Sequence, residues 1–324
     1  MSGPDPAIAA VRTAVREFLA SASPRDEVYV AVSGGADSLA LTEAAAFTGG
    51  RAGLKVRALV VDHGLQDASA ETAARAANTA RELGADTAEV LKVRVEGAGG
   101  PEAAARRARY GALRSALPHG HGLVLLGHTL DDQAETVLLG LGRGSGPRSL
   151  AGMRPLDPPW GRPLLGVTRA TTRRACAALG VDPWQDPHNE DPRFTRVRLR
   201  TEVLPLLEEV LSGGVAASLA RTAAQLREDT EALDTLAAEV HLRAFTGEEL
   251  DVAVLATEPP ALRRRVLRRW LLDSGVRELT DAHLRSVDAL VGNWRGQGGV
   301  WLPGDLVAKR AHGRLLLETP QSTT

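Results

Sequence analysis

The fold is decided by residues 27–38, EVYVAVSGGADS, in which a short apolar run leads directly into a glycine-rich turn. The β-branched and aromatic residues of 27–32 predict a strand, and residues 37–47 predict the helix that follows it. A turn between a strand and a helix presents backbone N–H groups and a helix N-terminus to an anion. The stretch therefore predicts a phosphate-binding loop, although the Gly-Lys-Ser/Thr of a Walker loop does not follow it.

Each residue type in this turn suits contact with phosphate. Glycines allow a close approach of the backbone, serines add hydroxyl donors, and Asp37 adds a carboxylate that can hold Mg²⁺ on phosphate oxygens. The alternative is an ordinary glycine-rich turn between a strand and a helix. The candidate phosphate-binding residues are Ser33, Gly34, Gly35, Ala36, Asp37 and Ser38.

The same alternation of strand and helix continues along the first half of the chain. Three further strands are predicted, over residues 55–62, 89–95 and 123–127. Helices are predicted between and after them, over residues 67–83, 101–117 and 130–141. This order predicts an α/β fold, a doubly wound parallel sheet with helices on both faces.

Polar residues follow three of these strands at the point where each strand ends. They are Ser33–Ser38, the pair Asp62-His63, and the segment His128–Glu135. In open parallel sheets, ligands bind in the crevice beyond the carboxyl ends of the strands. The three clusters are therefore expected to meet in one site.

The segment that opens the helix at 130–141 carries titratable groups on one face. With a period of 3.6 residues, that face holds His128, Asp132, Glu135 and Thr136. Asp132 can complete a Mg²⁺ site with Asp37, or Asp132 and Glu135 can bind a cationic amine. His128 can stabilise phosphate charge or move a proton. The alternative is a solvated helix start with a capping aspartate.

Arginines form two further candidate contacts with anions. Arg109 lies on the helix at 101–117 and can clamp a triphosphate, or it can have a surface role. A helix at 195–211 is predicted to carry an arginine stripe that suits phosphate contacts, with a solvated charge run as the alternative. The stripe consists of Arg193, Arg196 and Arg200.

Length and composition predict two domains in a globular protein. The 324 residues are 44% apolar and 24% charged, and Ser212-Gly213-Gly214 marks a boundary between domains 1–212 and 213–324. Helices are predicted over 215–242 and 258–292, and short strands over 300–302, 306–309 and 314–318. Arginines at 263–265 and 268–269 form either an outer helix face or a second RNA contact.

Several classes of protein are disfavoured by the sequence. The single cysteine, Cys176, excludes an internal disulfide, a four-cysteine iron–sulfur cluster and a CxxC redox pair within this chain. No apolar run is long enough to span a membrane, and the charged N-terminal stretch is typical of an amphipathic helix, not of a secretory signal. A cytoplasmic location without membrane partners is expected.

Five segments, taken in order, resemble the tRNA(Ile)-lysidine synthetase family within the PP-loop ATP pyrophosphatase superfamily. They are Ser33–Ser38, Val61–Leu65, Ala105–Tyr110, His128–Thr136 and Asp186–Arg200. The resemblance is specific over about residues 27–205 and weaker beyond them. It implies an adenine nucleotide α-hydrolase-like sheet and a smaller, mainly helical tRNA-binding domain. The length is that of compact two-domain members, without the third domain that some relatives carry.

The resemblance also implies a reaction and the residues that perform it. ATP adenylates the C2 oxygen of the wobble cytidine in an isoleucine tRNA with a CAU anticodon, and free L-lysine then displaces AMP to give lysidine. Asp62 and His63 join the loop in binding ATP, and Asp37 and Asp132 hold Mg²⁺. His128, Asp132 and Arg109 are the catalytic residues, Asp132 and Glu135 bind lysine, and the arginine stripe binds tRNA. The resemblance leaves a homodimer open.

Three other functions are compatible with the same loop. A PP-loop enzyme that inserts sulfur into tRNA is disfavoured because such enzymes commonly use several cysteines. An amide-forming ATP pyrophosphatase needs an ammonia source, and no glutaminase-like segment is visible in the sequence. A non-catalytic RNA-binding module leaves the loop and the acidic helix face without a purpose.

Overall fold

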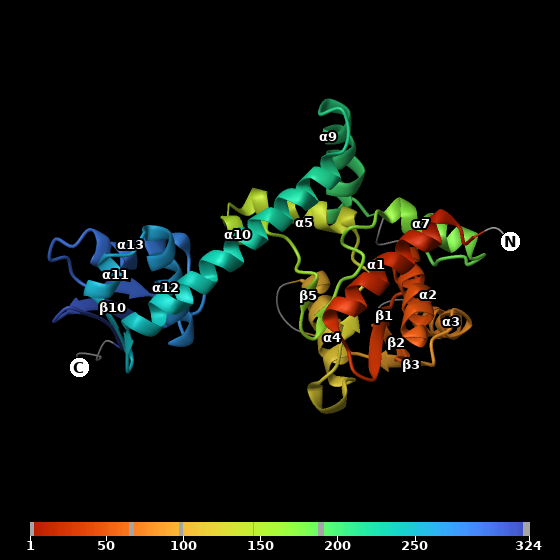
Figure 1. Cartoon of the computed structure of the whole chain (residues 1–324), viewed down its shortest axis with the longest axis horizontal. Helices are drawn as coiled ribbons and strands as arrows, with labels where there is room; N and C mark the ends of the chain where they lie inside the picture. The colour runs from red at the N-terminus through yellow and green to blue at the C-terminus, as the bar shows by residue number, and fades with distance from the viewer. Residues whose placement is uncertain (1–2, 65–67, 97–99, 145, 187–190, 320–324) are drawn as a thin grey trace. The chain divides into compact units, whose positions relative to one another are not determined.

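The computed structural model describes residues 3–64, 68–96, 100–144, 146–186 and 191–319 (Figure 1). The chain forms two compact units, each treated by itself below. The first comprises Met1–Gly144 and Ser149–Ala224, and the second comprises Ser145–Arg148 and Gln225–Thr324. The predicted boundary after residue 212 stays a prediction.

The first unit is built on a six-stranded sheet in the order β3-β2-β1-β4-β6-β5. All neighbouring pairs are parallel except β5 with β6, so the predicted parallel sheet carries an antiparallel strand at one edge. This edge lies within residues 142–166, whose many glycines, prolines and arginines predict a loop, because strands of two residues leave no alternating pattern. The strands are β1 (Glu27–Val32), β2 (Lys55–Asp62), β3 (Thr87–Lys92), β4 (Val124–Leu125), β5 (Leu156–Asp157) and β6 (Trp160–Gly161).

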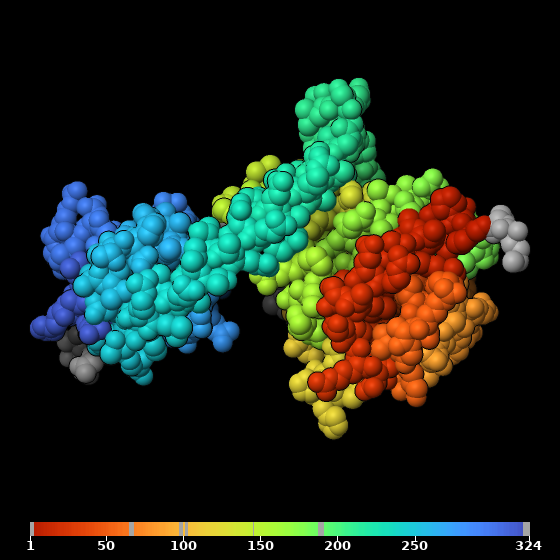
Figure 2. All heavy atoms as spheres, in the orientation of Figure 1, coloured from red at the N-terminus to blue at the C-terminus, as the bar shows by residue number. Residues whose placement is uncertain are grey.

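Helices cover both faces of this sheet, as the doubly wound class requires (Figure 1). Helices α1 (Pro6–Ala22), α2 (Ala36–Arg51), α3 (Ser69–Glu82) and α7 (Arg169–Ala178) pack on the face that receives Val28 and Val30. Figure 2 shows α1, in red, lying beside the orange segment that contains α2. Helix α4 (Pro101–Ser115) packs on the other face, which receives Tyr29 and Leu59.

Strand order places the functional crevice. The chain runs outward from β1 to β2 and β3, and then α4 carries it back to β4 on the opposite side of β1. The order therefore reverses between β1 and β4, the point at which ligands bind in open α/β sheets. The segment after β4 and the start of α2 approach closely here: a Cβ atom at Gly127 would lie 3.1 Å from the backbone of Asp37.

The remaining helices of the first unit follow β4 and the edge strands. They are α5 (Leu130–Arg143), α6 (Pro147–Leu150, whose first two residues belong to the second unit), α8 (Thr195–Arg198), α9 (Leu204–Val210) and α10 (Val215–Ala244, whose residues from Gln225 on belong to the second unit), with short helices at Pro118–Gly120 and Leu199–Val203. Among the described residues, no single helix has the length and apolar character to cross a membrane. One bent pair, Thr195–Val210 and Val215–Ala244, passes that test jointly, with 95° between its members.

The second unit contains helices packed on an antiparallel sheet of order β7-β8-β11-β10-β9. The predicted helix over 258–292 is two helices, because Thr280 caps a new one. The core centres on Trp270 and Leu250. The elements are β7 (Phe245–Thr246), β8 (Glu249–Asp251), α11 (Val252–Ala256), α12 (Pro260–Asp273), α13 (Asp281–Gly292), β9 (Val300–Leu302), β10 (Leu306–Ala311) and β11 (Arg314–Glu318).

The arginine cluster on α12 was expected to be an outer face or a second RNA contact, and two of its members are neither. Arg263 is buried, and its guanidinium pairs with Asp288. The Nε of Arg265 lies 3.0 Å from Asp234 Oδ1. The prediction fails for these two residues because the period of a helix does not reveal which carboxylates pack against it.

Candidate active site

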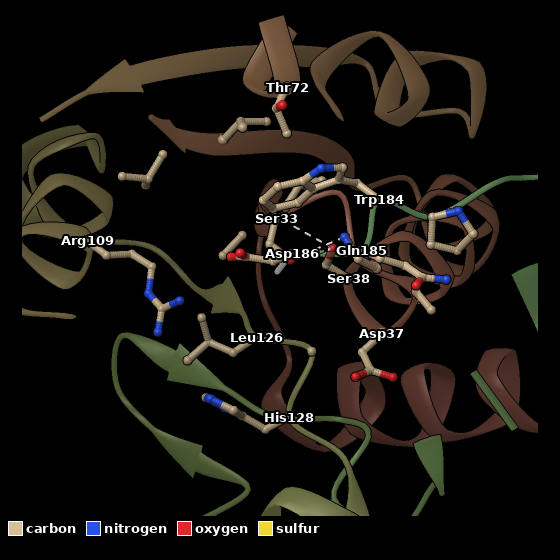
Figure 3. Close-up of a pocket in the computed structure, with 18 of the residues that line it drawn as sticks. Ser33, Asp37, Ser38, Thr72, Arg109, Leu126, His128, Trp184, Gln185 and Asp186 are labelled. Atoms are coloured by element: carbon tan, nitrogen blue, oxygen red, sulfur yellow. Dashed lines mark hydrogen bonds between the residues drawn. The ribbon is translucent and has the colours of Figure 1, made fainter. Parts of the chain in front are cut away.

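A crevice of about 1090 Å³ opens at the carboxyl ends of β1, β2 and β4 (Figure 3). The three polar clusters that follow these strands all contribute to it, as the sequence predicts. The predicted residues that line it are Ser33, Gly35, Ala36, Asp37, Ser38, Asp62, His63, Arg109, His128, Asp132 and Arg200.

The loop after β1 is held in shape by its own serines. The backbone N–H of Ser33 donates to Ser38 Oγ at 3.1 Å, and Ser38 Oγ donates to the carbonyl of Gly35 at 2.9 Å. Gly34 has φ +81°, a conformation that favours glycine. Gly35 caps α2 without a side chain, so the first N–H groups of that helix remain for a ligand. This is the geometry of an anion-binding loop.

Asp37 lies at the N-terminal end of α2, beside the loop. Its Oδ1 accepts a hydrogen bond from the Thr172 hydroxyl, and its Oδ2 lies 3.6 Å from Nε of Arg169. Burial raises the pKa of Asp37, and the contacts with Thr172 and Arg169 oppose that rise. A cation bound at Asp37 would relieve the cost of keeping this carboxylate ionised.

Asp132 has two roles at the start of α5. Its Oδ2 accepts hydrogen bonds from the backbone N–H and the hydroxyl of Thr129, both at 2.8 Å, so it completes a capping box. Its Oδ1 faces Nη2 of Arg169 at 2.7 Å. Burial alone would raise the pKa of Asp132, but Arg169 and Thr129 lower it. The capping alternative is thus correct, and it leaves Asp132 on the crevice wall.

Glu135 lies one turn further along α5, and its side chain is only 1% exposed. Its Oε1 lies 3.2 Å from Arg200 Nε and 3.5 Å from Arg169 Nη1. Its Oε2 lies 3.7 Å from Arg196 Nη1 and has no hydrogen-bond partner among the described residues. Burial and the nearby Asp132 raise the pKa of Glu135, and the arginines oppose that rise. An open oxygen on a buried carboxylate is a ready acceptor for a ligand.

The opposite side of the crevice is basic. Figure 3 shows Arg109 and His128 directed toward the same part of the crevice. Burial lowers the pKa of Arg109, and it lowers the pKa of His128 to about 4, so this imidazole is neutral at pH 7. The Nδ1 atoms of His63 and His128 are buried and have no hydrogen-bond partner in the described part of the chain. Asp62 stabilises the turn after β2 by accepting from the N–H of Gly64 at 3.0 Å.

The predicted arginine stripe does not remain together. Arg196 and Arg200 turn toward Glu135, whereas Arg193 is 84% exposed and pairs with Asp191. Arg193 precedes α8, so the helical period does not apply to it. The structure thus separates one exposed arginine from two at the acidic face.

Two residues of the site were not predicted. Arg169 contacts Asp37 beside the loop and Asp132 on α5. Trp184 lines the crevice, and its backbone N–H donates to the carbonyl of Gly34 at 2.9 Å. Trp184 lies in the irregular segment 182–192, where an isolated tryptophan was the available signal. Arg169 gave no signal, because its partners are more than 30 residues away. Asn189, one of the residues in the resembling segment, lies outside the described residues.

The donor chemistry near Asp37 suits Mg²⁺. This ion prefers carboxylate oxygens and completes its shell with water and substrate phosphates, so one or two carboxylates suffice. The described residues contain no cluster of three or more His, Cys, Asp or Glu side chains that would hold a metal without such a substrate. Arg169 contacts both Asp37 and Asp132, so a metal bound to both would share them with this arginine.

Comparisons with known proteins agree with this geometry. Residues 9–207 match a PP-loop domain, and residues 250–316 match a TilS substrate binding domain. A tRNA(Ile)-lysidine synthase from Rhodococcus erythropolis is 58% identical over 320 residues, which cover 96% of both chains. One from Nocardia farcinica is 60% identical over 316 residues, covering 95% of this chain and 96% of the relative. One from Mycobacterium tuberculosis H37Rv is 55% identical over 321 residues, covering 96% and 97%.

A solved structure supports the fold alone. The U34-tRNA thiolase NcsA from Methanococcus maripaludis superposes with a TM-score of 0.56 at 18% identity. The match covers 68% of this chain and 80% of that chain.

Proposed function

The chain belongs to the tRNA(Ile)-lysidine synthase family, and from this membership we propose how its crevice performs the ligation. The enzyme is a ligase that uses ATP to form a carbon–nitrogen bond. Its substrates are ATP, free L-lysine and the isoleucine tRNA with a CAU anticodon. The observation that carries the proposal is that a phosphate-binding loop and Asp132 line one crevice, while the buried Glu135 contacts Arg169 and Arg200, which also line it.

The first half-reaction is adenylation of the tRNA. The C2 oxygen of the wobble cytidine attacks the α-phosphorus of ATP, the bond from that phosphorus to the β-phosphate oxygen breaks, and pyrophosphate leaves. The loop at Ser33–Ser38 binds the phosphates, and Asp37 with Asp132 would hold Mg²⁺, which would supply positive charge to the departing pyrophosphate. Arg109, neutral His128 and His63 face the phosphates from the other side and stabilise the charge that develops.

The second half-reaction is lysine transfer. The neutral ε-amine attacks C2 of the cytidine, the bond from C2 to the adenylated oxygen breaks, and AMP leaves with that oxygen while the nitrogen loses a proton. Asp132 and Glu135 hold the amine in place. This role is supported by the burial of Glu135 and by its open Oε2 atom.

Incorporation of labelled lysine into tRNA tests this function directly. With ATP and Mg²⁺ present, lysine should enter the isoleucine tRNA with a CAU anticodon and not the methionine tRNA. A folded, ATP-binding protein that incorporates no lysine into either would contradict the proposal and favour a different adenylating PP-loop enzyme.

Two alanine variants test the amine-binding role. Asp132→Ala and Glu135→Ala should each slow lysine transfer and raise the KM for lysine, because each removes a carboxylate from the buried pair. Unchanged lysine kinetics in both variants would exclude the role.

The tRNA contacts are proposed for Arg193, Arg196 and Arg200, together with the mainly helical second domain. Each phosphate contact that is lost should weaken tRNA binding and reduce the slope of log K against log salt by about one. Arg193 is the clearest test because it is exposed. A salt slope unchanged by Arg193→Ala would remove this residue from the interface.

A cytoplasmic location belongs to the same proposal, and a homodimer stays a prediction.

Sulfur insertion into tRNA is the weaker alternative. Cys176 is buried, donates to the carbonyl of Ala36 and packs in the core of the first unit. Burial raises the pKa of its thiol to about 11, so little reactive thiolate forms at neutral pH.

A further inference from the structure

Arg169 lies between Asp37, beside the phosphate-binding loop, and the two carboxylates of α5, Asp132 and Glu135. It is the first residue of α7, a helix capped by Thr168. Its backbone N–H donates to Oδ2 of Asp131 at 2.8 Å. The start of α7 is therefore fastened to the start of α5, and the arginine side chain leaves from a fixed backbone position.

The guanidinium of Arg169 uses each of its three nitrogens on a different carboxylate. Nη2 lies 2.7 Å from Asp132 Oδ1, Nη1 lies 3.5 Å from Glu135 Oε1, and Nε lies 3.6 Å from Asp37 Oδ2. The side chain is 12% exposed, so it is held inside the protein. A planar guanidinium presents its donors in a rigid fork, which a lysine ammonium cannot reproduce. One side chain thus contacts all three carboxylates.

Charge explains why this position needs a cation. Three carboxylates that share a partly dehydrated site repel one another, and the repulsion is stronger than in water. Of these three carboxylates, Arg196 and Arg200 contact Glu135 alone in the described part of the chain, whereas Arg169 also contacts Asp132 and Asp37. Without it, Asp132 and Glu135 would move apart or take other partners.

The same contacts determine which oxygen is left for a substrate. Each oxygen of Asp132 already has one protein partner, Arg169 for Oδ1 and Thr129 for Oδ2, so a ligand at Asp132 would share an oxygen with one of them. Glu135 has its Oε1 between Arg169 and Arg200, and its Oε2 without a hydrogen bond. Glu135 Oε2 is therefore the carboxylate oxygen of this pair that has no hydrogen-bond partner among the described residues.

We propose that Arg169 is a positioning residue for lysine transfer, which sets Asp132 and Glu135 so that Glu135 Oε2 receives the amino group of lysine. This inference rests on the proposed function. A misplacement of about 1 Å in a reacting group can cost about 100-fold in rate. Loss of the fork should therefore slow lysine transfer about 100-fold. Adenylation should fall less than about tenfold, because Mg²⁺ on substrate phosphates needs only one or two carboxylates, and Asp37 keeps its Thr172 contact while its Arg169 contact is the longest of the three.

The test separates the two half-reactions in Arg169→Gln and Arg169→Lys. Pyrophosphate release is measured with tRNA and without lysine, and transfer is measured by adding labelled lysine to preformed adenylated tRNA on the enzyme. Arg174→Gln is the matched control, since Arg174 is exposed on the same helix. Arg169→Lys keeps the positive charge but lacks the planar guanidinium. Free guanidinium ion added to Arg169→Gln supplies that planar cation without a covalent link to the chain.

The expected result is a selective loss of transfer in Arg169→Gln, with partial recovery in Arg169→Lys or on adding guanidinium. Wild-type transfer in Arg169→Gln, or an equal loss of both half-reactions in a folded variant, would overturn the inference. If Arg169→Gln does not fold, the same split measured in Arg169→Lys decides. Wild-type protein and Arg174→Gln that release pyrophosphate but transfer no lysine would contradict the proposed function, and this inference with it.

Discussion

Two buried arginines, Arg169 in the crevice and Arg263 in the second unit, use the same ion-pair chemistry for different ends. Arg263 gives Nε and Nη2 to the two oxygens of Asp288, at 2.5 and 3.3 Å, and Nη1 to the carbonyl of Glu258 at 3.3 Å. Each of its nitrogens thus has one partner, and the pair joins α12 to α13. Arg169 instead divides its nitrogens among three carboxylates from two helices.

The difference lies in what surrounds each arginine. Near Arg169, Glu135 Oε2 and the Nδ1 of His128 are buried without a hydrogen bond in the described part of the chain. Both atoms carry a desolvation cost that a ligand would remove. Neither Arg263 nor Asp288 has a buried side-chain atom that lacks a hydrogen-bond partner. A satisfied network thus indicates a structural role, and an unsatisfied one indicates a binding site.

The largest effect is expected at the satisfied pair. Asp288→Ala should lower the stability of the second unit by about 3–5 kcal/mol, because it leaves the charge of Arg263 buried without a partner. Hydrogen–deuterium exchange of peptides from α12 and α13 would report the loss. Unchanged protection there would mean that Arg263 is solvated, and the contrast with Arg169 would break down.

Asp37→Asn should show the reverse behaviour. Pyrophosphate release should fall by about 10²–10³-fold, because the carboxylate that would neutralise departing phosphate is gone. The melting temperature should stay the same or rise, since burial already raises the pKa of Asp37 and makes its ionised form costly. Calorimetry and a pyrophosphate assay on one preparation test both parts. A fall in stability equal to that of Asp288→Ala would make Asp37 structural.

His128 gives the site a pH signature. Its pKa is about 4 in the folded protein and 6.5 in the unfolded chain, so the unfolded chain binds the proton first. The stabilising effect of neutral His128 is therefore complete above pH 6.5 and is lost as the pH falls toward 4. Between pH 7 and pH 5 this amounts to about 2 kcal/mol.

Urea unfolding of wild-type protein and His128→Gln at pH 7 and pH 5 would isolate this effect. The wild type should lose about 2 kcal/mol more than the variant over this interval, because other titrating groups cancel in the difference. Equal losses in both proteins would mean that His128 is protonated as easily in the folded state as in the unfolded chain.

The smallest effect is expected at an exposed ion pair. Asp281 and Arg285 pair at 2.5 Å on the surface of α13, one helical turn apart. Asp281→Ala should change stability by less than about 0.5 kcal/mol, because water and salt screen such a pair. Chemical denaturation of Asp281→Ala and Asp288→Ala side by side compares an exposed ion pair with a buried one. A loss of several kcal/mol would show that distance, not burial, determines the strength of these pairs.

Much of the first unit follows from local sequence patterns. The strands at 27–32 and 55–62 have the predicted bounds, and the helices predicted at 37–47, 67–83, 101–117 and 130–141 are found to within four residues at each end. These elements are long, periodic or bounded by glycine, so short-range physics determines them. The strand predicted at 123–127 has only two residues, and the edge strands at 156–161 were not predicted. Very short strands are defined by their neighbours and not by their own pattern.

The sequence alone determined the doubly wound class, the loop after β1 and the meeting of three strand ends at one crevice. Each depends on contacts within about 20 residues or on the general rule that parallel strands end at one edge. Tertiary structure alone decided that Arg169 joins Asp37 to Asp132 and Glu135, that Arg196 and Arg200 face Glu135, and that Arg263 is buried. Charged side chains look alike in sequence, and only packing determines which of them lose water and which partner replaces it.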